Sequence, residues 1–196
     1  MKEIAEIAEI TAAASEKAAL SPEAQKLFEK HMGVDVLPEK ISYENRGPDG
    51  LTNAEKKRIT QEVGWTSQIT DRIRSVEEYG IYKGAGLKEA EIGGEKALIR
   101  NDIDWQQLDE KGRGNAERIA RGLSPLDQNG NAIELHHIGQ QKDSPLAELT
   151  FREHRCDGND TILHDKTIES ETHGEGNTWD TQRQDYWKNR AYNLAV

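Results

Sequence analysis

The sequence predicts an α+β fold that is mostly helical and carries small β-hairpins. Two observations indicate helices: residues 3–20 place Ile and Ala on one helical stripe, and Ser or Thr followed by Glu three positions later recurs along the chain. The third observation is the run "AIELHH" at 132–137, whose apolar and polar residues alternate as in a half-buried strand.

The N-terminal part is predicted to be a helical segment of its own. A second helix, within 21–33, follows the one at 3–20. Pro and Gly then recur through residues 36–50, a composition typical of an irregular linker. We therefore predict an N-terminal helical segment, 1–45, and a separate domain, 46–196.

Two short helices are predicted between residues 52 and 84. Thr52 and Glu55 have the spacing of a capping box, and Ser75 with Glu78 repeats that spacing. Gly84 suits the exit of the second helix, because glycine readily adopts the left-handed conformation that ends helices.

A hairpin and another short helix are predicted next. Gly93 and Gly94 separate two short β-capable runs, which indicates a tight hairpin. Asn115 can cap a short helix that ends at Gly122.

Residues 126–170 then give the order strand, loop, strand, helix. The run "AIELHH" is followed by the polar loop "GQQKDS", the short run "LAEL", and a capping box at Thr150 and Glu153 that opens a helix. Because neighbouring residues of a strand point to opposite faces, His136 and His137 share one site only if the strand ends or bulges there.

Composition limits the function classes. The net charge of −10 argues against a general nucleic-acid coat, although an enzyme needs only a local cationic groove. The lone Cys156 excludes an internal disulfide and a cysteine-type zinc site, so a metal would need His, Asp or Glu ligands. No stretch of the sequence is long and apolar enough for a membrane span, and the start of the chain lacks the pattern of a secretory signal.

Histidines are clustered in the C-terminal half. Four of the six lie between residues 136 and 164, namely His136, His137, His154 and His164. Each one alone could equally cap backbone groups or lie in solvent. As a set they suit a metal centre with about three imidazole ligands and one unligated imidazole that acts as a base. A metal ion beside an imidazole that accepts a proton suits phosphodiester hydrolysis.

The segments "IELHHIGQ", "SPLAELT", "EHR" and "GNDTILH" resemble the HNH/endonuclease VII superfamily of ββα-metal nucleases, in particular its group with a Leu-His-His signature. Members of that group occur as C-terminal toxin domains of bacterial polymorphic toxins. The similarity covers about residues 95–170 and extends to "WKNRA" near the C-terminus. The resemblance implies a ββα-metal core at about 126–170.

The resemblance also implies roles for the histidines. His136 is then a metal ligand and His137 the general base, while His154 and His164 complete the metal shell. The ten-residue separation of His154 and His164 is longer than many HNH enzymes use. Glu148 replaces the central Asn of many members, and it either braces the loop that carries the base or contacts the ion through water.

Other polar residues have simpler interpretations. Glu153 is expected to cap its helix, with an active-site role as the alternative, and His173 is expected to lie in a solvated loop. Three residues are expected to form a turn whose carboxylates could support the metal ligands: Asp157, Asn159 and Asp160.

The last helix is predicted to pack on the core through its aromatic residues, Trp179, Tyr186 and Trp187. Its other face offers three cationic side chains for contacts with phosphates, or simply for solvation: Arg183, Lys188 and Arg190.

The expected function is a metal-dependent endonuclease, acting on DNA, that forms the toxic end of a larger secreted bacterial protein. Residues 1–45 would be a remnant of that delivery protein or an intrinsic part of the toxin. The resemblance implies export by a specialised secretion system, action in the cytoplasm of a target cell during interbacterial competition, and a cognate immunity protein. The ion could be Zn²⁺, Mg²⁺, Mn²⁺ or Ni²⁺. Two alternatives remain: a non-enzymatic module with a structural Zn²⁺, and the same chemistry on RNA.

Overall fold

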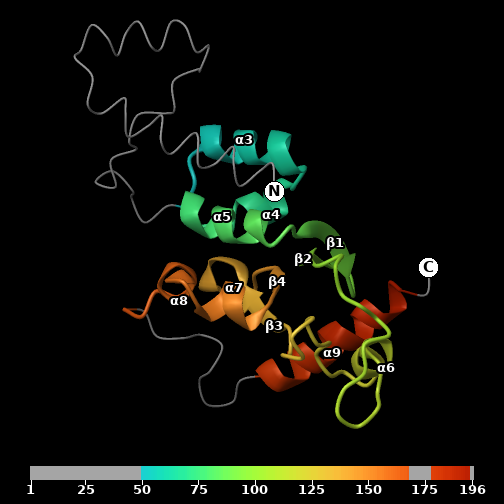
Figure 1. The fold of residues 1–196 in the computed structure, drawn as a ribbon. Coiled ribbons are helices and arrows are strands. Elements are labelled where there is room, and N and C mark those ends of the chain that lie inside the picture. The colour runs from blue at the N-terminus through green and yellow to red at the C-terminus, as the bar shows by residue number, and fades with distance from the viewer. Residues whose placement is uncertain (1–49, 168–177, 195–196) are drawn as a thin grey trace, which may run out of the picture. The chain divides into compact units, whose positions relative to one another are not determined.

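A computed structural model describes residues 50–167 and 178–194 of the chain (Figure 1). The predicted N-terminal helices, the boundary near residue 45 and His173 all lie outside the described residues, so these expectations stay predictions. The described helices are α3 (Asn53–Val63), α4 (Ser67–Thr70), α5 (Val76–Gly84), α6 (Asn115–Ala120), α7 (Phe151–Arg155), α8 (Asn159–Leu163) and α9 (Trp179–Tyr192). Within these ranges no helix combines the length and the apolar character needed to cross a membrane.

One sheet joins the described strands, which are β1 (Lys88–Ile92), β2 (Glu95–Ile99), β3 (Glu134–His137) and β4 (Leu146–Leu149). Their spatial order is β1-β2-β4-β3. β1 and β2 form the predicted hairpin, with both turn glycines at positive φ, and β3 and β4 form a second antiparallel pair. β2 and β4 pair in parallel and so join the two hairpins. β3 is therefore an edge strand of this sheet.

The sheet separates two hydrophobic cores. His136 lies opposite Ala147 in the β3–β4 ladder, and His137 lies opposite Leu146. Ala147 belongs to a core built with residues of α3, α4, α5 and α8, whereas Leu146 belongs to a core built with residues of α6 and α9. Because cross-strand partners share a face, His136 points to the first of these cores and His137 to the second.

The predicted N-terminal caps of α3 and α5 are present, but the glutamate of the second one has a different role. Thr52 and Glu55 make a reciprocal capping box at the start of α3. Ser75 caps α5 by accepting a hydrogen bond from the Glu78 backbone N–H, but the Glu78 side chain is fully buried and bonds elsewhere. A third short helix, α4, lies between them and was not predicted.

Asn115 is also used differently from the prediction. Gly114 occupies the N-cap position of α6, while the Asn115 side chain is buried and bonds the backbone of Asp104 and Leu126. A buried amide that bridges two loops satisfies more backbone groups than a cap does, which explains the difference.

The predicted order strand, loop, strand, helix is confirmed by β3, the 3₁₀ turn Ile138–Gln140, β4 and α7. The described part of the chain is thus α+β, and its ββα unit is compatible with an HNH-type fold.

Candidate metal centre and active site

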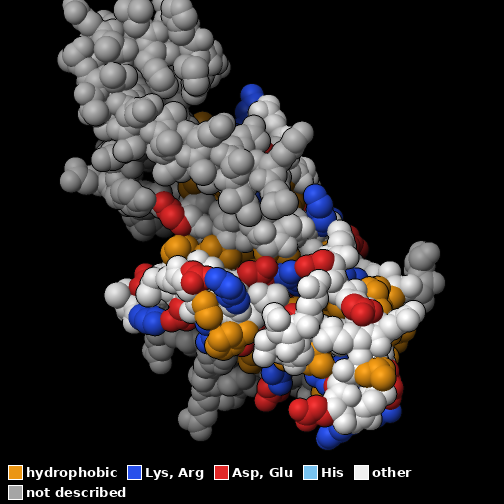
Figure 2. All heavy atoms as spheres, in the orientation of Figure 1, with side chains coloured by type: hydrophobic (Ala, Val, Ile, Leu, Met, Phe, Trp, Pro, Cys, Tyr) orange, Lys and Arg blue, Asp and Glu red, His pale blue; other side chains and the backbone are white. Residues whose placement is uncertain are grey.

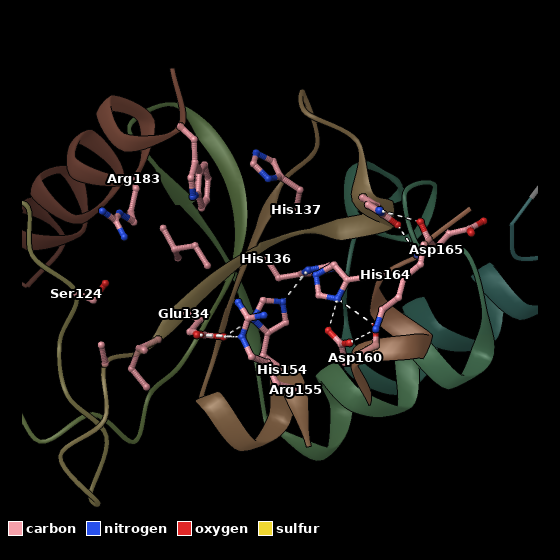
Figure 3. A pocket seen from close by; sticks show the side chains of 16 residues that line it. Ser124, Glu134, His136, His137, His154, Arg155, Asp160, His164, Asp165 and Arg183 are labelled. Atoms are coloured by element: carbon pink, nitrogen blue, oxygen red, sulfur yellow. Dashed lines mark hydrogen bonds and ion pairs between the residues drawn. The ribbon is translucent and has the colours of Figure 1, made fainter. Parts of the chain in front are cut away.

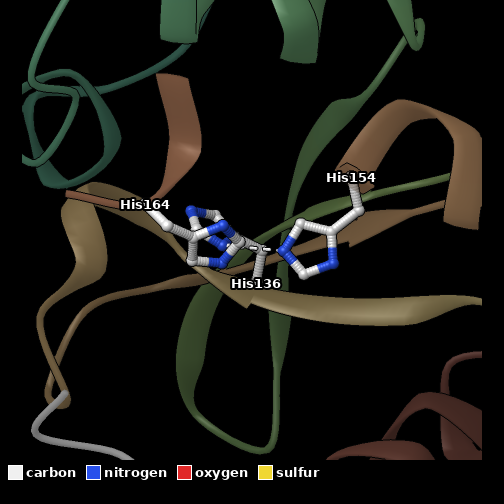
Figure 4. A group of neighbouring side chains, drawn as sticks. All are labelled: His136, His154 and His164. Atoms are coloured by element: carbon white, nitrogen blue, oxygen red, sulfur yellow. Dashed lines mark hydrogen bonds between the residues drawn. The ribbon is translucent and has the colours of Figure 1, made fainter. Parts of the chain in front are cut away.

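Three histidines from three elements meet beside the edge strand. His136 is on β3, His154 is on α7, and His164 directly follows α8. Each offers a ring nitrogen, and these atoms all lie within 4.8 Å of one another (Figure 4). Three separate elements therefore converge on one point.

The spacing of the rings suits a single ion. Nδ1 of His136 and Nε2 of His154 are 3.1 Å apart, and the three ring centroids are separated by 5.0, 5.0 and 4.9 Å. Two imidazole nitrogens at about 2.0–2.1 Å from one metal ion lie about 3 Å apart. The residues present therefore fit a divalent ion of the kind that imidazoles bind.

The environment of His136 and His164 favours their neutral form, which is the form that binds metal. Burial, reinforced by His154 and His164, holds the pKa of His136 well below its ordinary value. Burial also lowers the pKa of His164, and His154 adds to this effect. Nε2 of His136 is buried and has no hydrogen-bond partner within the described residues.

Two carboxylates orient the outer nitrogens of this cluster (Figure 3). Glu134 Oε2 is 2.5 Å from Nδ1 of His154. Nδ1 of His164 lies 3.1 Å from the Asp160 carbonyl oxygen, its hydrogen-bond partner, and 3.1 Å from Asp160 Oδ1. Carboxylates in this position fix the orientation of ligating imidazoles and raise their basicity. Asp160 was an expected candidate for such support. Glu134 was missed, although it lies two residues before His136 and therefore on the same face of the strand.

His137 reaches the same cavity from the other face of β3. Its ring lies 4.8 Å, centroid to centroid, from the ring of Trp179 at the start of α9. A cavity of about 510 Å³ extends around the edge of β3 and is lined by all four histidines of the cluster. The edge position of the strand thus brings both neighbours to one site without a bulge.

Cationic side chains line this cavity, but only one of them was predicted. Arg183 lines it, together with Arg155 and Lys166, whereas Lys188 does not. Each of the three also pairs with a carboxylate: Arg155 with Glu134, Lys166 with Asp160 and Arg183 with Asp180. In the face that Figure 2 shows, acidic and basic side chains of the described residues are interspersed. Any attraction of phosphates is therefore local.

The expectation that Arg190 contacts phosphates is wrong. Its side chain is buried and bonds Glu148 Oε1 at 3.0 Å and the Arg100 carbonyl oxygen at 3.0 Å. Positions 186, 187 and 190 follow the period of one helical face, so Arg190 shares the buried face of Tyr186 and Trp187.

Glu148 braces α9 rather than the loop that carries the base. It lies opposite Leu135 in the ladder, on the face away from His136. Its carboxylate accepts hydrogen bonds from Tyr186, Arg190 and the Arg100 backbone, which fasten α9 to the sheet. Burial raises the pKa of Glu148, and the charge of Arg190 opposes this rise.

Glu153 forms the predicted capping box of α7 with Thr150 and also pairs with Arg100. It thereby fixes the first turn of the helix that carries His154. Asp157 and Asn159 lie in and after the turn between α7 and α8, and Asn159 donates a hydrogen bond to the Glu153 carbonyl.

Comparison with known families gives the site its context. Residues 114–193 match a family model described as "A nuclease of the HNH/ENDO VII superfamily with conserved LHH". The match contains the Leu-His-His run at 135–137 and the other two histidines of the cluster. No solved structure matches the chain. Residues 114–193 are therefore similar to the LHH nucleases of the HNH/ENDO VII superfamily.

Proposed function

We propose that this protein is a metal-dependent endonuclease that hydrolyses phosphodiester bonds of DNA. The observation that carries the proposal is the meeting of three imidazoles at metal-ligand spacing with a fourth, His137, in the same cavity. The match of residues 114–193 to a nuclease superfamily supports phosphodiester hydrolysis as well.

The residues have distinct tasks in this mechanism. His136, His154 and His164 would hold the ion, which when bound supplies positive charge to the phosphate and the leaving 3′ oxygen. His137 would accept the proton of the attacking water. The cavity-lining cations, Arg155, Lys166 and Arg183, would contact the phosphates beside the scissile bond.

Three imidazole ligands favour a catalytic site over a structural one. Structural zinc sites are closed by four protein ligands, whereas catalytic sites keep a position open for water or substrate. Among the residues that the structure describes, the group of potential ligands contains three histidines and no fourth donor. The proposal therefore leaves room for the reaction at the ion.

The decisive experiment incubates the protein with plasmid DNA and with total RNA in parallel, in the presence of Zn²⁺, Mg²⁺, Mn²⁺ or Ni²⁺. We expect nicking and linearisation of the plasmid, which chelation by EDTA abolishes. His137→Ala should remove cleavage while circular dichroism and metal content stay unchanged. Cleavage of RNA alone would replace DNA as the substrate, and a tightly bound metal without any cleavage would favour the structural zinc module.

The biological setting is a further part of the proposal and rests on the resemblance described above. The nuclease would be the toxic end of a secreted bacterial protein, would act in the cytoplasm of a target cell, and would be blocked by an immunity protein that covers the cavity. Expression in a bacterial host should be toxic, and co-expression of the adjacent reading frame should relieve the toxicity. Toxicity that persists with a stably expressed, co-purifying neighbour would contradict this role.

A further inference from the structure

Two residues that precede the family-matched segment form hydrogen bonds with backbone groups next to the site histidines. Arg74 directly precedes the N-cap of α5, Glu78 lies in its first turn, and the matched segment begins only at residue 114. The Glu78 side chain is fully buried and that of Arg74 is largely buried. Their contacts converge on two short stretches of backbone, the turn after His137 and the end of α8 before His164.

Glu78 holds the turn that follows His137. Its Oε1 accepts a hydrogen bond from the Gly139 backbone N–H at 2.8 Å and one from the Tyr82 hydroxyl at 2.7 Å. Its Oε2 accepts one from the Arg74 backbone N–H at 2.8 Å. A carboxylate that accepts three hydrogen bonds in a buried position fixes its donors in place, because losing any of them leaves a buried polar group unsatisfied.

Arg74 holds the backbone that leads into His164. Its Nη2 donates to the carbonyl oxygens of Ile162 and Leu163 at 3.1 and 2.9 Å. These are the last carbonyls before His164, and a cation is favourable at such a helix end. Its Nη1 also donates to Gln140 Oε1 at 3.2 Å, so that one guanidinium links the turn after β3 with the end of α8.

The polar character of this pair calls for an explanation beyond stability. Replacing buried ionic groups by apolar side chains of similar volume is often neutral or stabilising, so packing alone does not require them. Here both groups direct their hydrogen bonds at backbone that carries site histidines. An apolar pair would fill the same space without fixing either segment.

We propose that Glu78 and Arg74 are positioning residues of the nuclease site, with Glu78 acting through the turn Ile138–Gln140 on His137 and Arg74 acting through the Ile162 and Leu163 carbonyls on His164. The inference rests on the proposed function. It predicts that the helices before the family-matched segment are needed to complete the site, and that the two residues affect different steps.

The test uses three variants of the full chain, Glu78→Gln, Arg74→Lys and Tyr79→Phe. Tyr79 is a buried neighbour on α5 that bonds Glu62 and does not contact the site, so Tyr79→Phe is the matched control for lost stability. Metal affinity is measured by calorimetric titration with Zn²⁺ or Mn²⁺. Plasmid cleavage is measured at saturating metal, with kcat and KM determined separately.

Arg74→Lys keeps the charge but loses the fork that reaches both carbonyls, so we expect it to weaken metal binding by about 10–100-fold. Glu78→Gln should leave metal affinity unchanged and lower kcat by up to about 100-fold, because a misplacement of roughly 1 Å has that effect on a reacting group. Tyr79→Phe should change neither. The proposal is overturned if all three variants lower only the melting temperature.

A second readout separates this proposal from the proposed function. The His137 ring lies against Trp179, so its NMR signal is sensitive to small displacements in the ring current of the indole. Glu78→Gln should shift the His137 ring signal, and Tyr79→Phe should not. If the wild type cleaves no nucleic acid, the proposed function fails, yet the His137 shift and the metal affinity of Arg74→Lys still decide whether these residues position the histidines.

Discussion

Glu134 and His154 come from different elements of the ββα unit, and their side chains meet at 2.5 Å between Oε2 and Nδ1. When Nδ1–H donates to the carboxylate, Nε2 keeps its lone pair and faces Nδ1 of His136. This contact therefore selects the tautomer that can bind a metal. It also joins the edge strand to the helix that carries the second ligand.

Glu134→Gln should weaken metal binding by about 10–100-fold, because loss of the carboxylate removes both the orientation and the basicity that it gives to His154. Calorimetric titration with Zn²⁺ or Mn²⁺ measures the effect. Glu91→Gln is the matched control, since Glu91 is an exposed glutamate on β1 that pairs with Lys96. Equal affinities of the two variants would refute the supporting role of Glu134.

The metal-free protein should lose stability as the pH falls below about 6.5, the ordinary pKa of histidine. The pKa of His136 is lowered in the folded state by burial, so the unfolded chain takes up a proton that the folded chain refuses. The contribution of the neutral His136 to the free energy of unfolding is therefore fully present above about pH 6.5 and is lost as the pH falls below it. Between pH 7.5 and 5.5 we expect His136 to contribute a loss of about 1 kcal/mol.

Urea unfolding of the metal-free protein at both pH values measures this loss, and His136→Gln isolates the contribution of the one imidazole. The variant should show a smaller difference between the two pH values than the wild type. Bound metal should raise the stability at pH 7.5, because it binds only the folded state and its imidazole ligands are neutral at that pH. An equal pH dependence in both proteins would mean that His136 protonates freely in the folded state.

Gly139→Ala should destabilise the protein and remove cleavage. Gly139 has φ of 70°, and a Cβ there would lie 2.1 Å from the Arg72 carbonyl oxygen. The backbone strain alone costs about 1–3 kcal/mol, and the overlap adds to it. Gly130→Ala is the control, because Gly130 also has positive φ but has open space around it. Chemical denaturation should give a larger loss for Gly139→Ala; similar losses would show that the turn can move away from Arg72.

Much of the ββα unit could be predicted from sequence, because its signals are local. The alternation in "AIELHH" gives β3, and the capping box at Thr150 and Glu153 gives the start of α7. The parallel pairing of Ala97 with Leu146 was not predicted. Strand pairing between residues so far apart in the chain depends on how the two cores pack, and no local period records it.

The candidate site divides in the same way. The three ligand candidates and His137 were named from clustering and resemblance, but the edge position of β3, which lets His136 and His137 line one cavity, follows only from the sheet order. From the sequence alone, the charges of Arg190 and Glu148 suggest a solvated position or a role in the active site. Their mutual burial needs two elements to be packed, and only the helical spacing of Arg190 from Tyr186 and Trp187 hinted at it.

Arg183 and Arg190 should give opposite phenotypes, although both were first expected to contact phosphates. Arg183 lines the cavity and is half exposed, so Arg183→Gln should leave stability unchanged and reduce the salt dependence of DNA binding by about one phosphate contact. Arg190→Gln leaves the buried Glu148 carboxylate without its cation, so it should destabilise the fold by about 3–5 kcal/mol. Binding of labelled DNA at several salt concentrations and urea unfolding distinguish the two variants. If Arg190→Gln unfolded like the wild type and lost only DNA affinity, the buried pair would not hold α9 in solution, and the phosphate role first assigned to Arg190 would return.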